Sequence, residues 1–212
     1  RNHHQISMNN LPKHLLFYLV FLTGLLIWSG IEPKERFTWF LEVLPAVIGM
    51  MILIFTYRNF KFSNLTYFWI FVHCIILIIG GKYTYADVPL FDWIQEYFDH
   101  SRNNYDKLGH FIQGFTPALI VREVLLRKNV VHGKKWLVFI VISTCLAISA
   151  AYELIEAVVS MIVSDGADSF LGMQGYVWDT QTDMLLALIG ACIAVALLSN
   201  FQDKSIAKIE TT

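Results

Sequence analysis

Six long apolar segments dominate this chain, and each is about as long as a helix that crosses a lipid bilayer. The segments are residues 14–30, 39–57, 65–81, 105–126, 136–163 and 178–199. A transmembrane helix needs roughly 17–25 residues to cross the hydrocarbon core. Of the 212 residues, 56% are hydrophobic and only 16% are charged. Few soluble domains combine so little charge with such long apolar runs, so we predict an all-α polytopic membrane protein, a six-transmembrane-helix bundle.

The chain is predicted to form one membrane domain over residues 1–212. Residues 1–13 form an N-terminal tail, residues 14–199 the six-helix bundle and residues 200–212 a cytoplasmic tail. The start Arg-Asn-His-His-Gln-Ile-Ser reads as a cloning remnant before a natural start at Met8, so its two histidines are left out of the site reasoning. A formal net charge of −1 without a basic stripe argues against a nucleic-acid partner.

Basic residues gather in one set of the loops and tails that flank the segments. They are Lys13, Arg58, Lys61, Arg127, Lys128, Lys134, Lys135, Lys204 and Lys208. The opposite loops are mainly acidic, although the first of them also holds Lys34 and Arg36. Lys and Arg are enriched in cytoplasmic loops, so both termini are predicted to be cytoplasmic.

The loop between the third and fourth segments, residues 82–104, holds an amphipathic pattern. Its apolar residues recur at the spacing of one helix face, and they are Leu90, Trp93, Ile94, Tyr97 and Phe98. Pro89 suits the first turn of a helix, so we expect an amphipathic helix that lies in the membrane interface. The apolar, glycine-rich residues 164–177 are expected to fold back over the same end of the bundle.

Small residues four apart let helix backbones approach closely. Two such pairs are Ala147 with Ala151 and Gly190 with Ala194. They predict a tight contact between the fifth and sixth segments. No internal repeat is visible, which argues against an inverted-repeat transporter.

Three segments carry ionisable side chains in pairs that are three or four residues apart. The pairs are Asp106 with His110, Glu153 with Glu156, and Asp179 with Asp183. Each pair lies on one face of its predicted helix, and with cytoplasmic termini all three lie at similar depth near the external side. An ionisable residue at the bilayer centre costs at least about 2.5–3.5 kcal/mol, so the pairs predict one shared functional site.

Five carboxylates and one imidazole with little opposite charge cannot all stay ionised in a medium of low dielectric constant. Either cations bind, or several carboxylates hold protons. Oxygen-rich ligation with one imidazole suits a divalent metal ion such as Zn, Mg, Mn or Fe. The predicted metal ligands are Asp106, His110, Glu156, Asp179 and Asp183. Glu153 is the predicted catalytic carboxylate that moves protons, and Glu153 and Glu156 could exchange these roles.

Four further residues are expected around the site. Gln113 lies one helical turn beyond His110 and could orient a ligand or the substrate. Lys107 is the nearest base in the sequence, although it is offset from the face of Asp106 and His110. Tyr83 and Tyr85 are candidates for the rim of an external cleft. Near the other end of the fourth segment, Arg122 and Glu123 are expected to mark the membrane interface.

Three functions fit this pattern. The leading hypothesis is a metal-dependent membrane hydrolase or transferase that acts on a lipid or lipid-linked envelope substrate. The second is a transporter or channel for protons or divalent cations that uses the same carboxylates. The third is a non-catalytic membrane protein whose polar cluster is structural. Membrane lipids are the expected partners, and the oligomeric state is left open.

Three stretches carry a family resemblance: Asp-Lys-Leu-Gly-His-Phe at 106–111, Tyr-Glu-Leu-Ile-Glu at 152–156 and Trp-Asp-Thr-Gln-Thr-Asp-Met at 178–184. With Gly-Lys-Tyr-Thr-Tyr-Ala at 81–86, the chain resembles the YjdF-type family of uncharacterised bacterial inner-membrane proteins over most of its length. This resemblance implies a polytopic protein of the bacterial inner membrane and no established reaction.

A looser similarity over the last three segments is to VanZ-like proteins. These proteins also have an Asp-Lys-x-x-His-Phe helix start, an acidic helix and a later Asp-rich helix. The VanZ pattern usually has an amide after its last acid, where this chain has Asp183. The similarity implies a role linked to the cell envelope, in glycopeptide tolerance.

Overall fold

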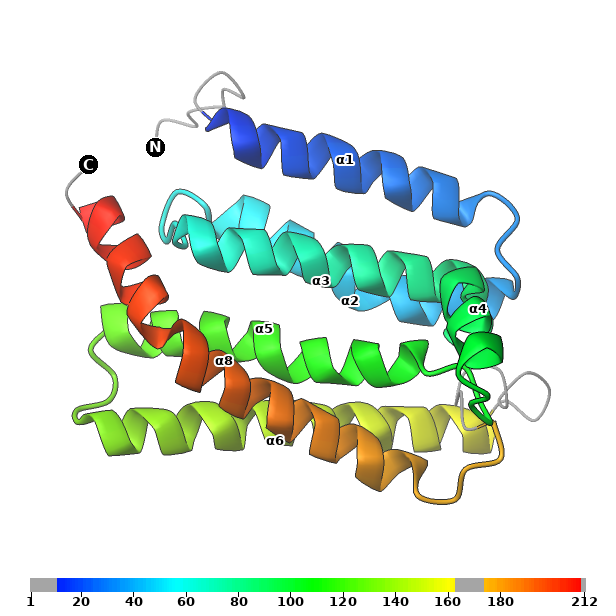
Figure 1. Cartoon of the computed structure of the whole chain (residues 1–212). Helices are drawn as coiled ribbons and strands as arrows, with labels where there is room; N and C mark the ends of the chain where they lie inside the picture. The colour runs from blue at the N-terminus through cyan, green and yellow to red at the C-terminus, as the bar shows by residue number, and fades with distance from the viewer. Residues whose placement is uncertain (1–10, 163–173, 211–212) are drawn as a thin grey trace.

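The computed structural model describes residues 11–162 and 174–210, and these residues form helices, turns and loops without a strand. The helices are α1 (Lys13–Gly30), α2 (Arg36–Thr56), α3 (Asn64–Tyr83), α4 (Pro89–Tyr97), α5 (Tyr105–Arg127), α6 (Lys134–Ile162) and α8 (Asp179–Glu210). The long helices run back and forth between the two ends of the molecule, with α8 crossing the others obliquely and the short helix α4 at one end (Figure 1).

Five of these helices, α1, α2, α3, α6 and α8, are long and apolar enough to cross a membrane. The prediction of an all-helical, multi-pass membrane protein is confirmed at this level. The fourth predicted segment is the 23-residue helix α5, which is more polar than the other five. It lies in the middle of the bundle (Figure 1). Its polar residues His110, Thr116, Arg122 and Glu123 are buried.

The two ends of the bundle carry different structures. We call one the α4 end, because α4 lies there together with the start of α5, the end of α6 and the start of α8. The other is the terminal end, where α1 begins and α8 finishes (Figure 1). Since successive long helices alternate in direction, every predicted acidic pair falls near the α4 end.

The closest helix packing is between α5 and α8, and two glycines permit it. A Cβ atom on Gly114 of α5 would lie 1.8 Å from the carbonyl oxygen of Ala187. A Cβ atom on Gly190 of α8 would lie 2.1 Å from the carbonyl oxygen of Phe111. Neither position can accept a side chain without separating the helices, so the two glycines fix how near the starts of α5 and α8 come.

The sequence predicted that the small-residue pairs bring α6 and α8 into close contact, and this prediction was wrong about the neighbouring helix. Gly190 faces α5 rather than α6, and Ala194 is fully buried in the core that α5, α6 and α8 share. Ala147 and Ala151 of α6 are exposed. Small residues allow close approach on whichever side a neighbour lies, and spacing alone does not identify that neighbour.

Apolar side chains fill the inside of the bundle and also cover much of its outside. The core between α5, α6 and α8 is made of Ile112, Phe115, Ala118, Leu119, Leu137, Val141, Cys145, Ala191 and Ala194. On the outside, Phe55, Met161 and Leu197 are 75%, 82% and 65% exposed. Apolar patches of this extent are unfavourable in water and typical of surfaces that contact lipid or another protein.

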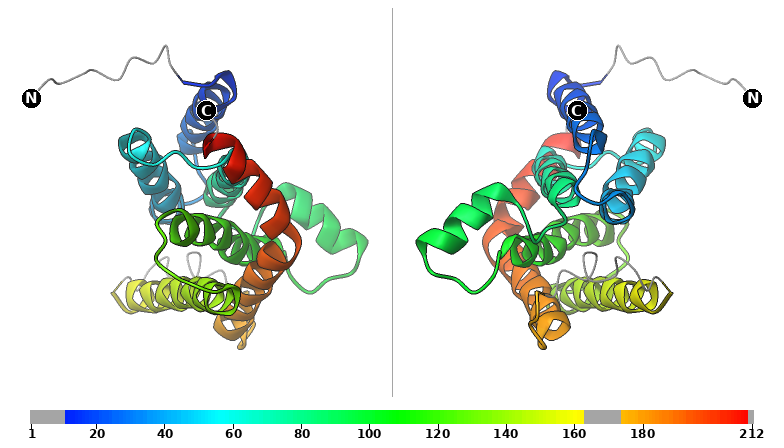
Figure 2. Two further views of the ribbon diagram at one scale, coloured as in Figure 1. Left: turned by 90° about the vertical axis from the view of Figure 1, so that its left-hand side faces the viewer. Right: turned by 90° about the vertical axis from the view of Figure 1, so that its right-hand side faces the viewer.

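Two predictions about the connections can be compared with the structure. The amphipathic pattern does form a helix, α4, which projects sideways from the bundle in Figure 2. Helix α8 continues to Glu210, so residues 200–210 of the predicted tail are helical. No glycine or proline interrupts the sequence from 191 to 210, so nothing ends the helix earlier. Of the predicted glycine-rich loop 164–177, residues 164–173 lie outside the described residues.

Candidate metal centre

Buried ionisable side chains from three helices meet at the α4 end, as the sequence predicts. Asp106 and His110 lie in the first two turns of α5, and Asp179 and Asp183 in the first two turns of α8. Glu153 belongs to the last part of α6. His110, Glu153, Asp179 and Asp183 are each 7% exposed or less, and the Asp106 side chain is 13% exposed. The polar faces of these helices therefore turn toward one another and away from the surroundings.

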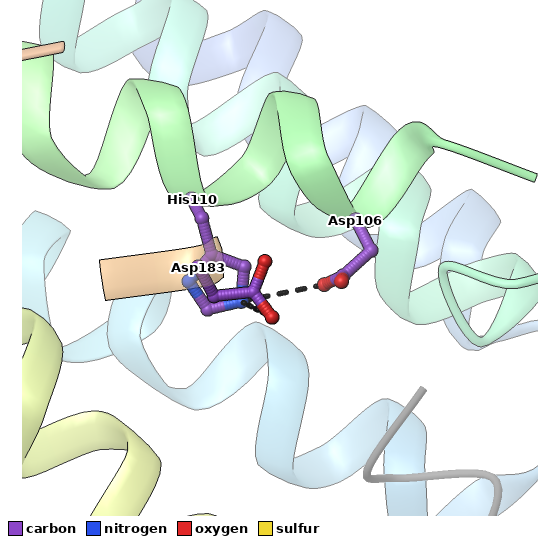
Figure 3. A group of neighbouring side chains, drawn as sticks. All are labelled: Asp106, His110 and Asp183. Carbon is purple, nitrogen blue, oxygen red and sulfur yellow. Dashed lines mark ion pairs between the residues drawn. The ribbon is translucent and has the colours of Figure 1, made fainter. Parts of the chain in front are cut away.

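Asp106, His110 and Asp183 form the most compact group, which we call the triad (Figure 3). The His110 Nε2 atom lies 3.3 Å from the Asp106 Oδ1 atom and 3.9 Å from the Asp183 Oδ2 atom. One ligand atom from each residue lies within 4.8 Å of the other two. Ligand atoms around a zinc ion are roughly 3–3.5 Å apart, given metal–ligand bonds of about 2.0–2.2 Å. A small inward movement would let the triad hold a divalent ion.

The other nitrogen of His110 orients the ring. Its Nδ1 atom lies 3.0 Å from the Gln113 Oε1 atom, one helical turn along α5, and 3.7 Å from the Glu153 Oε1 atom. A proton on Nδ1 would be donated to Gln113, which leaves the lone pair of Nε2 facing the two aspartates. Metal-binding histidines commonly use the second nitrogen in this way. Gln113 thus lies where the sequence predicts a residue that orients a ligand.

Glu153 is only partly satisfied by its surroundings. Its Oε1 atom is buried, and the described residues offer that atom no hydrogen bond. The nearest ionisable partner is the His110 ring, which is beyond hydrogen-bonding distance. A buried carboxylate oxygen without a donor is costly, so it favours the arrival of a proton or a cation.

Asp179 is held by two cations instead of joining the triad. Its Oδ1 atom accepts from the Lys107 Nζ atom at 2.5 Å and from the Arg102 Nη1 atom at 2.7 Å. Lys107 also donates to the Asp183 Oδ1 atom at 2.8 Å, and an Arg102 nitrogen lies 3.6 Å from Asp106. Lys107 therefore connects two of the predicted ligands, although the sequence indicated an offset from their face.

Sequence analysis missed two members of the cluster. Glu42 of α2 is buried, and the Tyr152 hydroxyl lies 3.4 Å from its Oε2 atom. It is the lone acid of an apolar segment, without a partner three or four residues away, so the pairing pattern did not select it. Arg102 lies in the loop before α5. Its spacing of four residues from Asp106 was the signal that could have found it.

The two predicted rim tyrosines lie in different places. Tyr85 is buried, and its ring occupies the space where Gly80 and Gly109 lack side chains. The same side chain is within hydrogen-bonding reach of Glu42. Tyr83 instead lies against Trp28 of α1, with ring centres 6.2 Å apart. Only Tyr85 therefore contacts the acidic cluster.

The cluster carries far more negative than positive groups. Its six carboxylates are Glu42, Asp106, Glu153, Glu156, Asp179 and Asp183. Glu156 is buried and faces Glu153, His110 and Glu42, but it lies outside the triad. Lys107 and Arg102 are the permanent cations. If all six carboxylates were ionised and His110 were neutral, the cluster would carry four more negative than positive charges. Protons or a bound cation must offset most of this excess.

A second buried acid lies near the terminal end, where the sequence predicted interface residues. Glu123 is fully buried, so that prediction was wrong. Its carboxylate accepts from the Ser63 backbone N–H at 2.7 Å, from the Ser63 and Thr66 hydroxyls at 2.8 and 2.7 Å, and from Arg127 at 3.0 Å. We call these four residues the Glu123 network. Because its carboxylate accepts so many hydrogen bonds from the protein, Glu123 lies inside the bundle instead of facing the membrane surface.

The fold and the cluster define a helical, multi-pass membrane protein with an acidic site buried near one end. The chain belongs to the family described as "Predicted membrane protein (DUF2238)", whose model matches residues 14–204. It is 49% identical over 180 residues to the inner membrane protein YjdF of Escherichia coli (strain K12), which covers 85% of this chain and 86% of that protein. No solved structure matches the chain. These matches confirm the resemblance to the YjdF-type family and the prediction of a multi-pass protein of the inner membrane.

Proposed function

We propose that the acidic cluster binds a divalent metal ion and that the protein is a metal-dependent hydrolase or transferase. Its substrate is a lipid or lipid-linked molecule of the cell envelope. Asp106, His110 and Asp183 are the first ligands. Glu156 belongs to the same cluster and can complete the coordination, and Asp179 can do so if it exchanges Lys107 or Arg102 for the ion. Zn, Mg, Mn and Fe all accept such a mixture of carboxylates and one imidazole.

One observation carries this proposal: the triad is preorganised while the cluster around it is electrically incomplete. Two carboxylates and an oriented imidazole converge on one position. The nearby Glu153 Oε1 atom is buried and has no hydrogen-bond donor among the described residues. A purely structural cluster would be expected to satisfy its buried oxygens. A divalent ion satisfies several of them at once.

The chemistry that follows divides the work between the ion and Glu153. When bound, a divalent ion would supply positive charge that polarises the substrate and stabilises developing negative charge. In hydrolysis, Glu153 takes a proton from water as the water oxygen bonds to the electrophilic atom of the substrate, the bond from that atom to the leaving oxygen breaks, and Glu153 passes the proton to the leaving oxygen. In transfer, a hydroxyl group of the acceptor replaces the water.

The membrane arrangement that fits this function has six spans, with α5 as the fourth, and both termini in the cytoplasm. The spans α3, α6 and α8 pack against α5, so its buried polar residues face protein and not lipid. The α4 end then lies on the external side, and α4 lies in the interface with Leu90, Trp93 and Tyr97 toward the membrane. Exposed tryptophans at span ends, Trp136 and Trp178, fit the same placement.

Transport through the bundle has less support. Between the triad and the Glu123 network, the described core is mainly apolar, and Phe115, Leu119 and Val141 are each 6% exposed or less. Its buried polar atoms are few and belong to Thr116, Ser149 and His73, so a proton or cation would cross this layer with few side-chain partners, at considerable cost. An enzyme needs access from one side only, which agrees better with a closed inner half.

Manganese binding tests the proposal directly. Electron paramagnetic resonance of the purified chain, titrated with Mn²⁺ in maltoside detergent, should show about one tightly bound ion per chain. D183N should weaken binding at least about tenfold, because it removes a ligand charge. The matched control is D203N, since Asp203 is a half-exposed acid paired with Arg122 at the other end. Absence of binding, or equal binding by the two variants, would refute the metal site.

A further inference from the structure

A cavity of about 570 Å³ opens at the α4 end, between the loop that precedes α5 and the start of α8. Its lining includes Arg102, Lys107 and Thr182, together with Tyr176 from the turn that leads into α8. We call it the entry pocket. A cavity of this size accommodates a small polar group with part of its attached chain.

The entry pocket and the metal centre share two side chains. Lys107 lines the pocket and donates to Asp179 and Asp183. Arg102 lines the pocket, donates to Asp179 and lies close to Asp106. A molecule in the pocket therefore contacts cations that already contact the predicted ligands. This places the pocket directly beside the acidic cluster.

The groups around the pocket suit an anion with several oxygen atoms. Arg102 and Lys107 converge below the Tyr176 ring, whose centre is 5.9 and 5.6 Å from their charged groups. Ser101 and Thr182 add hydroxyl groups, and Asp99 is the only carboxylate of the described lining. A guanidinium fork beside an ammonium group is the arrangement that binds phosphate oxygens well.

The start of α5 strengthens this preference. Asn104 precedes the helix and makes no side-chain cap there, and it also lines the pocket. The first backbone N–H groups of a helix attract anions, and the helix dipole adds to the attraction. The N–H group of Tyr105 donates to the Asn103 Oδ1 atom at 3.0 Å, so the contribution of the helix start comes from the dipole and the other N–H groups of the first turn, beside Arg102 and Lys107.

We propose that the entry pocket binds a phosphate group of the substrate and presents it to the metal centre. The substrate class is then a phosphorylated lipid, and this inference rests on the proposed function of the cluster. A lipid is favoured over free phosphate because α4 lies beside the pocket and exposes Leu90, Trp93 and Tyr97, which are 62%, 59% and 70% exposed. These side chains could contact acyl chains while the phosphate enters the pocket.

The experiment compares three probes by calorimetry with the full chain in maltoside detergent: dihexanoyl phosphatidic acid, inorganic phosphate and dihexanoyl glycerol. We expect phosphatidic acid to bind most tightly and the glycerol lipid, which has no phosphate, not to bind. R102Q and Y176L should each weaken binding about tenfold or more, which is the effect of losing one charge-assisted contact. K135Q is the control, because Lys135 is exposed at the terminal end.

The outcomes separate the inference from the proposed function. If neither phosphate compound binds, or if Y176L and R102Q bind as the unaltered chain does, the inference is wrong. If inorganic phosphate binds as tightly as phosphatidic acid, the pocket takes free phosphate and the lipid assignment is overturned. Mn²⁺ titration of the same samples reports on the metal centre alone. Loss of Mn²⁺ binding with retained phosphate binding would refute the metal and keep the pocket.

Discussion

The bundle buries carboxylates near both of its ends but surrounds them in different ways. At the terminal end, Glu123 is a single acid, and its oxygens receive donors from Ser63, Thr66 and Arg127. At the α4 end, six acids face two permanent cations, and the Glu153 Oε1 atom has no donor among the described residues. The first site is complete with protein groups, whereas the second needs something more.

The difference indicates what each site does. A buried acid whose donors are all supplied by the fold ties helices together, and the Glu123 network joins the start of α3 to the end of α5. A cluster with excess negative groups destabilises the bundle unless protons or cations join it. Proteins retain such a cost where function requires it.

The largest expected effect is the loss of stability when the Glu123 network is broken. E123A removes the acceptor of the buried Ser63 N–H and of the Ser63 and Thr66 hydroxyls, so the free energy of unfolding should fall by about 3–5 kcal/mol. Unfolding of the purified chain by dodecyl sulfate in mixed micelles measures this loss. E156A, at the incomplete site, removes one of several like charges and should cost much less when no metal is added. Equal losses in both variants would remove the distinction between the two ends.

The next effect is on metal affinity. H110A removes the imidazole of the triad and should weaken Mn²⁺ binding by more than about 100-fold, beyond the range typical of residues that only orient a ligand. Isothermal titration of the ion into the purified chain measures the change. H73A is the matched control, because His73 is a histidine of α3 that makes no contact with the triad among the described residues. A similar loss in both variants would contradict the assignment.

A smaller effect should follow from the residue that orients His110. Q113L removes the acceptor 3.0 Å from the Nδ1 atom, so the ring can turn or change its tautomer. Mn²⁺ affinity should fall about 10–100-fold, and the stoichiometry should stay the same. The same titration checks both quantities. Unchanged affinity would show that Gln113 does not hold the ring.

The smallest effect concerns a satisfied carboxylate outside the spans. Burial alone would raise the pKa of Glu35, but the N–H groups of Thr38 and Phe37 donate to its carboxylate and hold the pKa below its ordinary value. Such a group stabilises the fold above its unfolded pKa, and the contribution disappears as the pH falls through the lower folded pKa. E35A should therefore cost about 1 kcal/mol at pH 7 and less below pH about 4. Unfolding measured at both pH values tests this, and a loss independent of pH would contradict it.

Much of the fold could be predicted from the sequence, because the bilayer sets the length of each span and turns its polar residues inward. The start of α5 at Tyr105 follows from the length of its apolar segment, and the helix at Pro89–Tyr97 from apolar periodicity and the proline at its first turn. The neighbours of each helix could not be predicted. Gly190 of α8 would allow close packing against α6 as well as it allows the observed packing against α5. Local spacing contains no information about which surfaces meet.

The candidate site shows the same division. Asp106, His110 and Asp183 were found because each has a partner one helical turn away. Glu42 and Arg102 were missed because only the folded chain brings them to the others. Glu123 was placed at the membrane surface because its hydroxyl donors, Ser63 and Thr66, lie in a different segment.

Anomalous X-ray scattering from crystals of the full chain grown with Mn²⁺ tests the central claim most directly. We expect an anomalous peak about 2.0–2.4 Å from a carboxylate oxygen of Asp106, the Nε2 atom of His110 and a carboxylate oxygen of Asp183. A map in which this position has no peak, while Mn²⁺ is seen elsewhere on the chain, would contradict it.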